Sequence, residues 1–292
     1  MTTIKYAVIS GGGHTFFSTL GAIQQLEKDN IWNIKNIKSI YGTSAGAIAA
    51  TIICLKFEDW TTVNDYFIKR PWHDAFPISA SNILDAYSKR GIFDKKFIET
   101  VFKPLFLAKD VSLDINMQQF YELSGIELHF YSVEIHDFQT IDISYKTHPT
   151  LELFTAIYMS SAIPILFSPC IIDDKCYVDG GIITNYPLKY CIDNVILENG
   201  TTDEIISFMN EYEKEPESKI TEKSNILDLV MCFLHKLIYN LSTDTKQEKI
   251  KHEVVYSTKT ISLSYSSLVL SSQEIREELM EKGRLSASKI PC

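Results

Sequence analysis

Residues 4–55 read IKYAVISGGGHTFFSTLGAIQQLEKDNIWNIKNIKSIYGTSAGAIAATIICL and contain one local pattern twice. The apolar run 4–9 ends at three glycines, and apolar residues then recur at helical spacing up to Lys28. The run 37–41 ends at GTSAG and is followed by the apolar segment AIAATIICL. Each half predicts a strand, a glycine turn and a helix. Two strands joined by a crossover helix form a parallel βαβ unit, so we expect both glycine turns at the carboxyl edge of the sheet, where α/β folds bind ligands.

The remaining chain divides into a helical part, a strand-rich part and an extension. Residues 57–125 show amphipathic helical spacing, 127–135 alternate as a strand that 138–143 can pair with, and 151–159 return to helical spacing. Short strands and turns fill 164–187. The charged stretch 211–223 is typical of a solvated loop, with a helical extension after it. We therefore predict an α/β domain over residues 4–191 and a largely helical C-terminal extension over 192–292, packed on or beside it.

Composition excludes several classes of protein. The 292 residues are 45% hydrophobic, which is ample for a large core, and the net charge of −9 does not favour attraction to nucleic acid or to an anionic bilayer. The N-terminus lacks the features of a signal peptide, and no apolar segment reaches the length of a membrane span. We expect an intracellular protein, cytoplasmic or peripheral at membranes, without cofactor or metal. The scattered cysteines favour free thiols over disulfides or a zinc site; they are Cys54, Cys170, Cys176, Cys191, Cys232 and Cys292.

The motif Gly42-Thr43-Ser44-Ala45-Gly46 is the strongest local signal. It is a G-x-S-x-G placed where a strand meets a helix, which is the context of a nucleophile elbow. Gly42 and Gly46 allow the backbone to pass close to the strand and the helix, while the Ser44 hydroxyl projects at the helix N-terminus, where developing negative charge is favoured. A tight turn with a capping serine is the simpler alternative.

The glycine run Gly11-Gly12-Gly13 ends the neighbouring strand and should lie beside Ser44. Acyl transfer needs backbone N–H groups aimed at a tetrahedral oxyanion, and glycines let such amides point inward unobstructed. A dinucleotide-binding loop is the alternative, but its fingerprint requires glycine at position 16, which is Phe16.

The third element is Asp179-Gly180-Gly181, after a short apolar run. On its own this sequence is typical of a turn. A nucleophilic serine needs a base, however, and an Asp at a strand end can supply it. Histidine is the usual base, and the histidines are His14, His73, His129, His136, His148, His235 and His252. His235 and His252 follow Asp179 as in a Ser-Asp-His triad and remain alternatives, although an ordinary α/β-hydrolase has more strands before its elbow than the two seen here.

Together these elements resemble the patatin-like phospholipase family, whose signature is G-G-G-x-R/K-G, then G-x-S-x-G, then D-G-G/A. Secondary features also match in order, and the resemblance covers about residues 4–190; these features are Gly21, Gly91-Ile92-Phe93-Asp94, Ser160-Ser161-Ala162-Ile163-Pro164, Phe167, Pro169 and Asn185-Tyr186-Pro187. The first motif departs from the family, because His14-Thr15-Phe16 replaces the Arg or Lys and the Gly that follow the glycines.

The resemblance implies a three-layer α/β/α fold with a mainly parallel central sheet and a lipid acyl hydrolase of the phospholipase A type. Ser44 and Asp179 form the catalytic dyad, Gly11, Gly12 and Gly13 form the oxyanion hole, and Gly180 and Gly181 support the Asp loop. The substrate is then a phospholipid or another acyl-ester lipid. The lost cation leaves a second hypothesis, in which the chain is a catalytically weak or inactive lipid-binding or regulatory relative.

Residues 226–241 carry a broad apolar stripe at helical spacing. We expect a packing helix of the extension. An interfacial helix with peripheral membrane contact is the alternative, and the small positive charge on its polar side counts against it.

Overall fold

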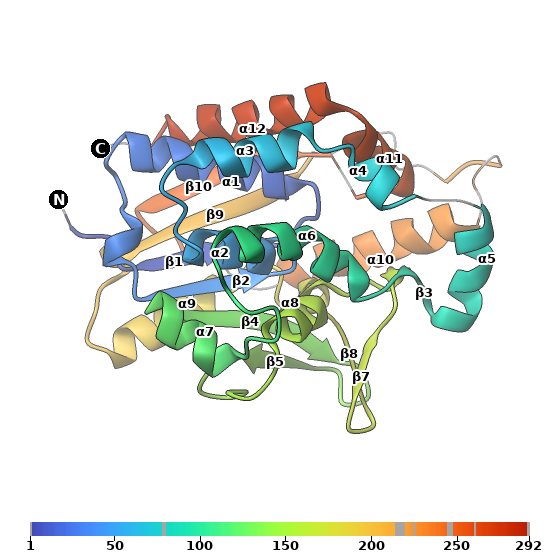
Figure 1. The fold of residues 1–292 in the computed structure, drawn as a ribbon, viewed down its shortest axis with the longest axis horizontal. Coiled ribbons are helices and arrows are strands. Elements are labelled where there is room, and N and C mark those ends of the chain that lie inside the picture. Colours follow the sequence, from blue (N-terminus) through green and yellow to red (C-terminus); the bar gives the residue numbers. More distant parts are fainter. Residues whose placement is uncertain are drawn as a thin grey trace.

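An eight-stranded mixed sheet forms the centre of the computed structural model, which describes residues 2–77, 80–213, 220–222, 224, 226–243, 248–259 and 261–290 (Figure 1). Its strands are β1 (Tyr6–Ile9), β2 (Ser39–Thr43), β4 (Glu127–Glu134), β5 (Gln139–Ile143), β7 (Cys170–Ile172), β8 (Lys175–Asp179), β9 (Ile205–Tyr212) and β10 (His252–Thr258). The strand order is β10-β9-β1-β2-β4-β8-β7, and β5 also pairs with β4. The first five strands in this order are parallel, whereas β8, β7 and β5 are antiparallel to their neighbours.

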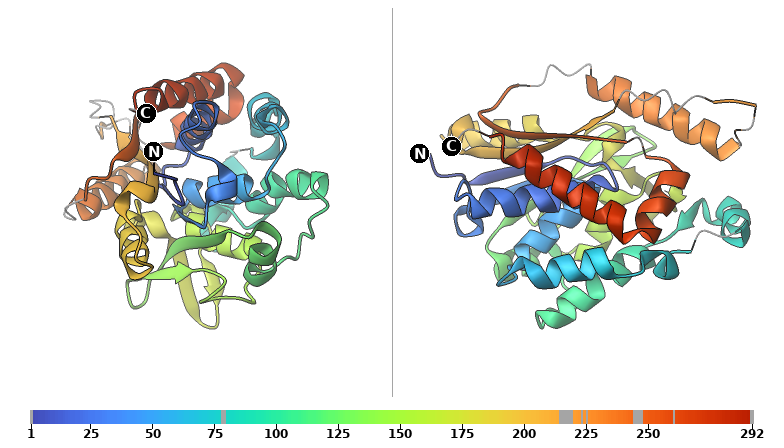
Figure 2. Two further views of the ribbon diagram at one scale, coloured as in Figure 1. Left: turned by 90° about the vertical axis from the view of Figure 1, so that its left-hand side faces the viewer. Right: turned by 90° about the horizontal axis from the view of Figure 1, so that it is seen from above.

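Helices cover both faces of this sheet (Figure 2). They are α1 (Thr15–Lys28), α2 (Ala45–Cys54), α3 (Trp60–Lys69), α4 (Trp72–Ala75), α5 (Ala80–Lys89), α6 (Lys96–Ala108), α7 (Met117–Ser124), α8 (Leu153–Ser161), α9 (Leu188–Leu197), α10 (Ile226–Thr243), α11 (Leu263–Ser271) and α12 (Gln273–Ala287). The short segments are the 3₁₀ turns η1 (Ile34–Asn36), η2 (Gly180–Ile182) and η3 (Thr202–Glu204) and the parallel strand pair β3 (Gly91–Phe93) and β6 (Ile165–Phe167).

The side chains of β1 point alternately to the two faces of the sheet, and this shows how the layers form. Ala7 and Ile9 point into the larger core, which also contains residues of α1, α2, α6, α8 and α12. Tyr6 and Val8 point to the opposite face, where they pack with α9. Successive side chains of a strand point to opposite faces, so both faces of this fully buried strand are covered. The expected three-layer arrangement with a mainly parallel sheet is confirmed.

The two glycine turns lie side by side as expected. β1 pairs in parallel with β2 and places Ile9 opposite Gly42, so both strands end at the same edge. The start of α2 lies very close to the end of β1, because a β-carbon added to Gly46 would lie 2.2 Å from the carbonyl oxygen of Ile9. A glycine at this position therefore lets α2 begin directly against the end of β1.

The C-terminal region contains more than the expected helices. Residues 192–292 include α10, α11 and α12, and also β9 and β10, which extend the central sheet beyond β1. β9 pairs with β1, and β10 pairs with β9. The loop expected at 211–223 begins as the end of β9, and residues 214–219 and 223 of it lie outside the described residues. The sheet therefore continues across the boundary predicted at residue 191.

Two glycines allow α12 to pack against α1. A β-carbon on Gly21 would lie 2.0 Å from the carbonyl oxygen of Met280, and one on Gly283 would lie 1.8 Å from that of Ser18. The Ser18 hydroxyl also donates a hydrogen bond to the carbonyl of Leu279 at 2.9 Å. Backbone contact of this kind ties the last helix to the helix that follows the first glycine turn.

Arg276 on α12 is a buried anchor, with 2% of its surface exposed. Its guanidinium donates to the carbonyls of Ile68 and Arg70 at the end of α3 and of Val269 and Leu270 on α11, at 2.7 to 3.2 Å. A buried cation needs such partners, since an unpaired one costs several kcal/mol. Arg276 thus joins α11 and α12 to α3, which lies far earlier in the sequence.

None of the helices in the described part of the chain is both long and apolar enough to cross a bilayer. The five described cysteines are free, and Cys292 lies outside the described residues.

We expect Gly283→Ala to lower the free energy of unfolding by about 1–3 kcal/mol, because the new methyl group meets the Ser18 backbone. Helix propensity alone predicts the opposite sign, a gain of about 1 kcal/mol. Urea denaturation gives the change, with the exposed Glu278→Ala on the same helix as the control. A stabilised Gly283→Ala variant would show that α1 and α12 are not in backbone contact.

Candidate active site

Ser44 occupies a strained turn between β2 and α2. Its backbone has φ 55° and ψ −118°, a positive φ that residues with a β-carbon rarely adopt. Its N–H donates to the Ser160 hydroxyl at 3.0 Å. A β-carbon on Gly42 would lie 2.7 Å from the backbone of Gly46, so the turn closes only with a glycine there. Ser44 therefore lies in a tight strand-to-helix turn that depends on the glycine at position 42.

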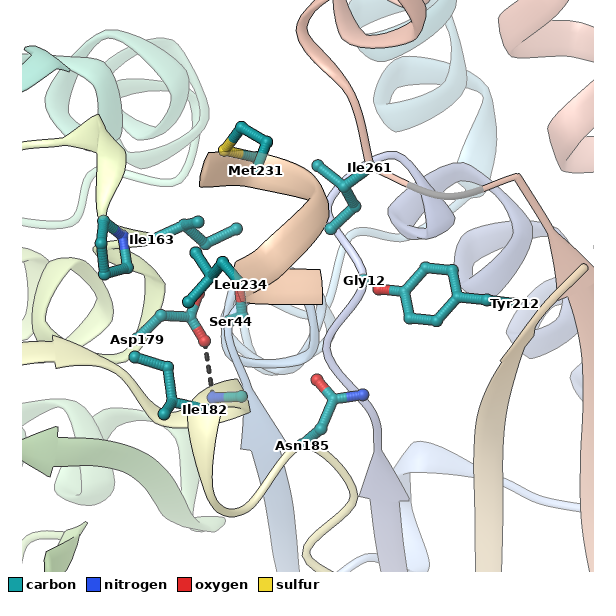
Figure 3. A pocket seen from close by; sticks show the side chains of 12 residues that line it. Gly12, Ser44, Ile163, Asp179, Ile182, Asn185, Tyr212, Met231, Leu234 and Ile261 are labelled. Carbon is teal, nitrogen blue, oxygen red and sulfur yellow. Dashed lines mark hydrogen bonds between the residues drawn. The ribbon is translucent and has the colours of Figure 1, made fainter. Parts of the chain in front are cut away.

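Asp179 lies beside Ser44 at the end of β8 (Figure 3). Its Oδ1 accepts a hydrogen bond from the N–H of Gly181 at 2.6 Å. The Ser44 hydroxyl is close enough to lower the pKa of the carboxyl, although Oδ2 has no partner of standard hydrogen-bond geometry among the described residues. Burial dominates and raises the pKa of Asp179 to about 7.

The glycine loop reaches the same place from β1. Gly11 donates its N–H to the carbonyl of Asn185 at 2.9 Å, so this amide is already engaged. Gly12 and Gly13 have φ of 153° and 57°, which glycine adopts readily. Their N–H groups have no backbone partner among the described residues, whereas their carbonyls accept from Thr15 and Phe16 in the first turn of α1.

Further hydrogen bonds hold the three motifs together. The Thr43 hydroxyl donates to the carbonyl of Thr184 at 2.8 Å, and the N–H of Asp179 donates to the carbonyl of Ala162 at 3.0 Å. A β-carbon on Gly180 would lie 2.2 Å from the carbonyl oxygen of Tyr131, so this glycine lets the Asp loop lie against β4. The structure thus brings all the predicted site residues into one region.

The unusual His14-Thr15-Phe16 segment makes this region apolar. His14 precedes α1, is buried, and packs edge-on against Tyr265 with ring centroids 4.8 Å apart. Burial lowers the pKa of His14 to about 4, against a smaller opposing effect of the Lys259 backbone, so the ring is neutral at pH 7. Phe16 packs against Phe67, with the two ring centroids 4.7 Å apart. His14 therefore does not replace the missing cation.

Two cavities meet at Ser44. The smaller has a volume of about 40 Å³ and contains the dyad; it is lined by Gly12, Ser44, Ile163, Pro164, Asp179, Gly181, Ile182, Asn185, Tyr212, Met231, Leu234 and Ile261. The larger, of about 190 Å³, has a wall rich in aromatic side chains, which include Phe16, Phe17, Phe67, Trp72, Phe76, Phe93, Phe97 and Phe167. No described residue lining the larger cavity is a lysine, arginine, aspartate or glutamate. The secondary motif residues Phe93 and Phe167 thus contribute to this apolar wall.

The structure describes the side chains of six of the seven histidines. None of the six whose side chains are described forms a hydrogen bond with Ser44: His129 lies between Glu127 and Asp142, and His252 begins β10 at the opposite edge of the sheet. His235 lies on α10, and its side chain is outside the described set. Within the described residues, no group of three or more His, Cys, Asp or Glu is arranged to hold a metal ion.

Several lining residues were missed by the sequence analysis, and they come from the C-terminal region. Tyr212 is the last residue of β9, Met231 and Leu234 extend from α10, and Ile261 precedes α11 (Figure 3). Met231 and Leu234 belong to the apolar stripe over 226–241, which was the available signal. No feature of the sequence around Tyr212 or Ile261 indicates that these residues line the site.

A mainly parallel α/β sheet with a strained serine elbow and a buried aspartate at its carboxyl edge defines a hydrolase-like α/β protein. Residues 7–192 match the family described as Patatin-like phospholipase. The chain belongs to this family, as the motifs had indicated.

Individual relatives are distant. The chain is 27% identical over 194 residues to "Probable lipid hydrolase 463L" of Invertebrate iridescent virus 6, covering 64% of this chain and 63% of the relative. It is 25% identical over 217 residues to "Uncharacterized protein R571" of Acanthamoeba polyphaga mimivirus, covering 68% and 65%. The match thus spans somewhat less than two thirds of each relative. The crystal structure of VipD from Legionella pneumophila has a similar fold, with a TM-score of 0.54 at 16% identity, covering 96% of this chain and 67% of VipD.

We expect Asp179→Asn to alter the pH dependence of stability. The carboxyl has a higher pKa in the folded state, about 7, than in the unfolded chain, so parent stability falls as pH rises from about 4 to 7. A shift of about three units corresponds to up to about 4 kcal/mol. The asparagine variant lacks this loss, so its stability relative to the parent should increase by that amount between about pH 4 and pH 8, measured by urea denaturation at each pH. Parallel curves for the two proteins would contradict the buried carboxyl.

Proposed function

We propose that this protein is a lipid acyl hydrolase of the phospholipase A type, with Ser44 as nucleophile and Asp179 as base. The observation that carries the proposal is the position of Ser44: it lies at a strained elbow, beside a buried carboxyl, where a large apolar cavity opens. Family membership and the relative named as a probable lipid hydrolase support the same activity. The substrate class is a phospholipid or another acyl-ester lipid.

The chemistry proceeds through an acyl-enzyme. Asp179 accepts the proton of the Ser44 hydroxyl as the oxygen attacks the ester carbonyl, and returns it to the alcohol that leaves. Water then attacks the acyl-enzyme, Asp179 accepts its proton, and the fatty acid departs as the Ser44 oxygen is reprotonated. Because burial raises the pKa of Asp179 to about 7, this carboxylate is a stronger base than an exposed aspartate, and it is ionised above that pH.

The oxyanion hole is assigned to the Gly11–Gly13 loop, with the amides of Gly12 and Gly13 as donors. The Gly11 amide donates to Asn185, and its role is to hold the loop beside Ser44. A β-carbon on Gly11 would lie 3.2 Å from that of Ser44, so the loop approaches the nucleophile closely. Fixed backbone donors of this kind stabilise charge that develops in the transition state.

The larger cavity is the site for the acyl chain. Its wall is almost wholly apolar, and it begins at Ser44 itself. Removing an alkyl chain from water contributes about 0.8 kcal/mol per methylene group, so long chains bind there in preference to short ones. An uncharged wall suits a fatty acyl chain and offers no counter-ion to a phosphate.

The second hypothesis, a weak or inactive lipid-binding relative, is favoured by one observation. Thr15 stands where the family signature has Arg or Lys, and the neighbouring His14 is neutral and buried. The glycine amides, the elbow and the aspartate are nevertheless retained, so we favour an active enzyme.

We expect Ser44→Ala to abolish hydrolysis of p-nitrophenyl esters and phospholipid at about pH 8, and Asp179→Asn to lower kcat/KM at least about a hundredfold, because the attack loses its general base. A fluorophosphonate probe should label the parent at Ser44. The exposed Asp193→Asn is the matched control. Full activity of Asp179→Asn would indicate a histidine base, and an unlabelled but folded parent would favour the inactive relative.

We expect Ile48→Trp to shorten the preferred acyl chain. Ile48 is half-buried on α2 and lines the larger cavity next to Ala45. A larger side chain there should reduce kcat/KM for p-nitrophenyl palmitate at least about tenfold, the value of two lost methylene contacts, and leave the acetate ester within about twofold. Ile196→Trp, at an exposed position on α9, is the control. Equal losses for both esters would place the acyl chain elsewhere.

A further inference from the structure

One helix, α10, combines a face that lines the candidate site with a second apolar face that is exposed. Met231 and Leu234 line the cavity that contains Ser44 and Asp179. Met231 is buried and also packs with Ile92 and Leu166 of the strand pair β3 and β6. α10 contacts η2, the turn that follows Asp179, so it is part of the wall of the site.

The second face has no cover within the described residues. It is formed by Ile226, Leu229, Val230, Phe233 and Leu237, which are 70, 48, 37, 63 and 42% exposed. With 3.6 residues per turn these five positions fall within an arc of about 100°, and Leu234 lies about 90° and Met231 about 150° from its centre. The exposed stripe is therefore contiguous with the site-facing residues around one helix.

Exposure of this kind is unusual in a water-facing helix. Single exposed apolar side chains are common, but a contiguous stripe of five marks an interaction surface. Figure 2 shows α10 at the margin of the molecule, outside the helices that pack directly on the sheet. Its outer surface is thus free to meet a partner without any change in the core.

We propose that the exposed stripe of α10 docks on the surface of a lipid aggregate and thereby places the Ser44 cavity at the lipid. This inference rests on the proposed function, because a lipid hydrolase must take a substrate that lies in such a surface. The continuity of the stripe with Met231 and Leu234 identifies the occupant, since the same helix lines the cavity that the substrate must enter.

Charge indicates which kind of surface is bound. α10 carries one acidic residue, Asp228, and one basic residue, Lys236, and the whole chain has a net charge of −9. Attraction to anionic lipid requires clusters of basic residues, which α10 lacks. Binding should therefore depend on apolar insertion, and zwitterionic phosphatidylcholine vesicles are the suitable probe.

The test compares two double variants in the full chain. Leu229→Ser with Phe233→Ser removes the centre of the stripe and leaves the site-facing residues unchanged. Ile196→Ser with Leu197→Ser is the matched control, since these side chains are 60 and 79% exposed. They lie at the end of α9, just before β9, whose first residue pairs with the first residue of β1. The control pair is thus near the amino edge of the sheet, opposite Ser44.

Vesicle binding is measured by flotation in a Ser44→Ala background, so that catalysis does not alter the lipid. We expect the α10 double variant to bind phosphatidylcholine vesicles at least about tenfold more weakly than the parent, and the control to bind as the parent does. Equal binding by both variants would overturn the proposal. Binding that requires phosphatidylglycerol and disappears at high salt would also overturn it, because charge would then be the cause.

Measurements of hydrolysis distinguish a failure of the docking proposal from a failure of the proposed enzymatic function. With Ser44 intact, the α10 double variant should hydrolyse vesicle phospholipid at least about tenfold more slowly, yet hydrolyse dissolved p-nitrophenyl butyrate within about twofold of the parent. A parent that binds through α10 but hydrolyses neither substrate supports docking and refutes the enzyme. A parent that hydrolyses both, with no effect of the α10 variant, refutes docking alone. Light scattering that shows a dimer broken by the α10 variant would assign the stripe to a second copy instead.

Discussion

The backbone of Ser44 is the constraint around which the site is built. A residue with a β-carbon is held at φ 55° and ψ −118° only when the surrounding packing supports it. Here the support comes from backbone contacts: Gly42 against Gly46, and Gly46 against Ile9 at the end of β1. The contact that holds the elbow therefore also places the first glycine turn beside it. The hydrogen bond from Ser44 to Ser160 fixes α8, and with it the chain segment that leads to β8 and Asp179.

Burial has opposite effects on stability and on the chemistry of the site. It raises the pKa of Asp179, which makes folding progressively less favourable as pH rises from about 4 to 7 and makes the carboxylate a stronger base. Burial also keeps His14 neutral, so the region that joins the two cavities holds no described cation. On the proposed function, this site would take an uncharged acyl ester and orient it by backbone amides and by an apolar cavity.

The C-terminal residues belong to the same architecture as the motifs. β9 lies directly beside β1, and α12 packs on α1 through paired glycine contacts. Arg276 joins α12 to α11 and to the end of α3, and Phe67 of α3 lines the larger cavity. A single network of contacts therefore connects the last helix with both the glycine loop and the larger cavity.

The sequence by itself determined the βαβ unit, the meeting of its two glycine turns, the elbow and the family, because these depend on local periodicity and on residues whose backbone preferences are strong, such as Gly42 and Gly46. It predicted helices in the C-terminal region and missed β9 and β10. β9 is defined by its pairing with β1, almost 200 residues earlier in the chain, and β10 by its pairing with β9. It also favoured a packing role for the 226–241 stripe. Only the tertiary structure divided that stripe into a site-facing pair and an exposed face, because exposure depends on which neighbours the fold supplies and not on the order of residues along a helix.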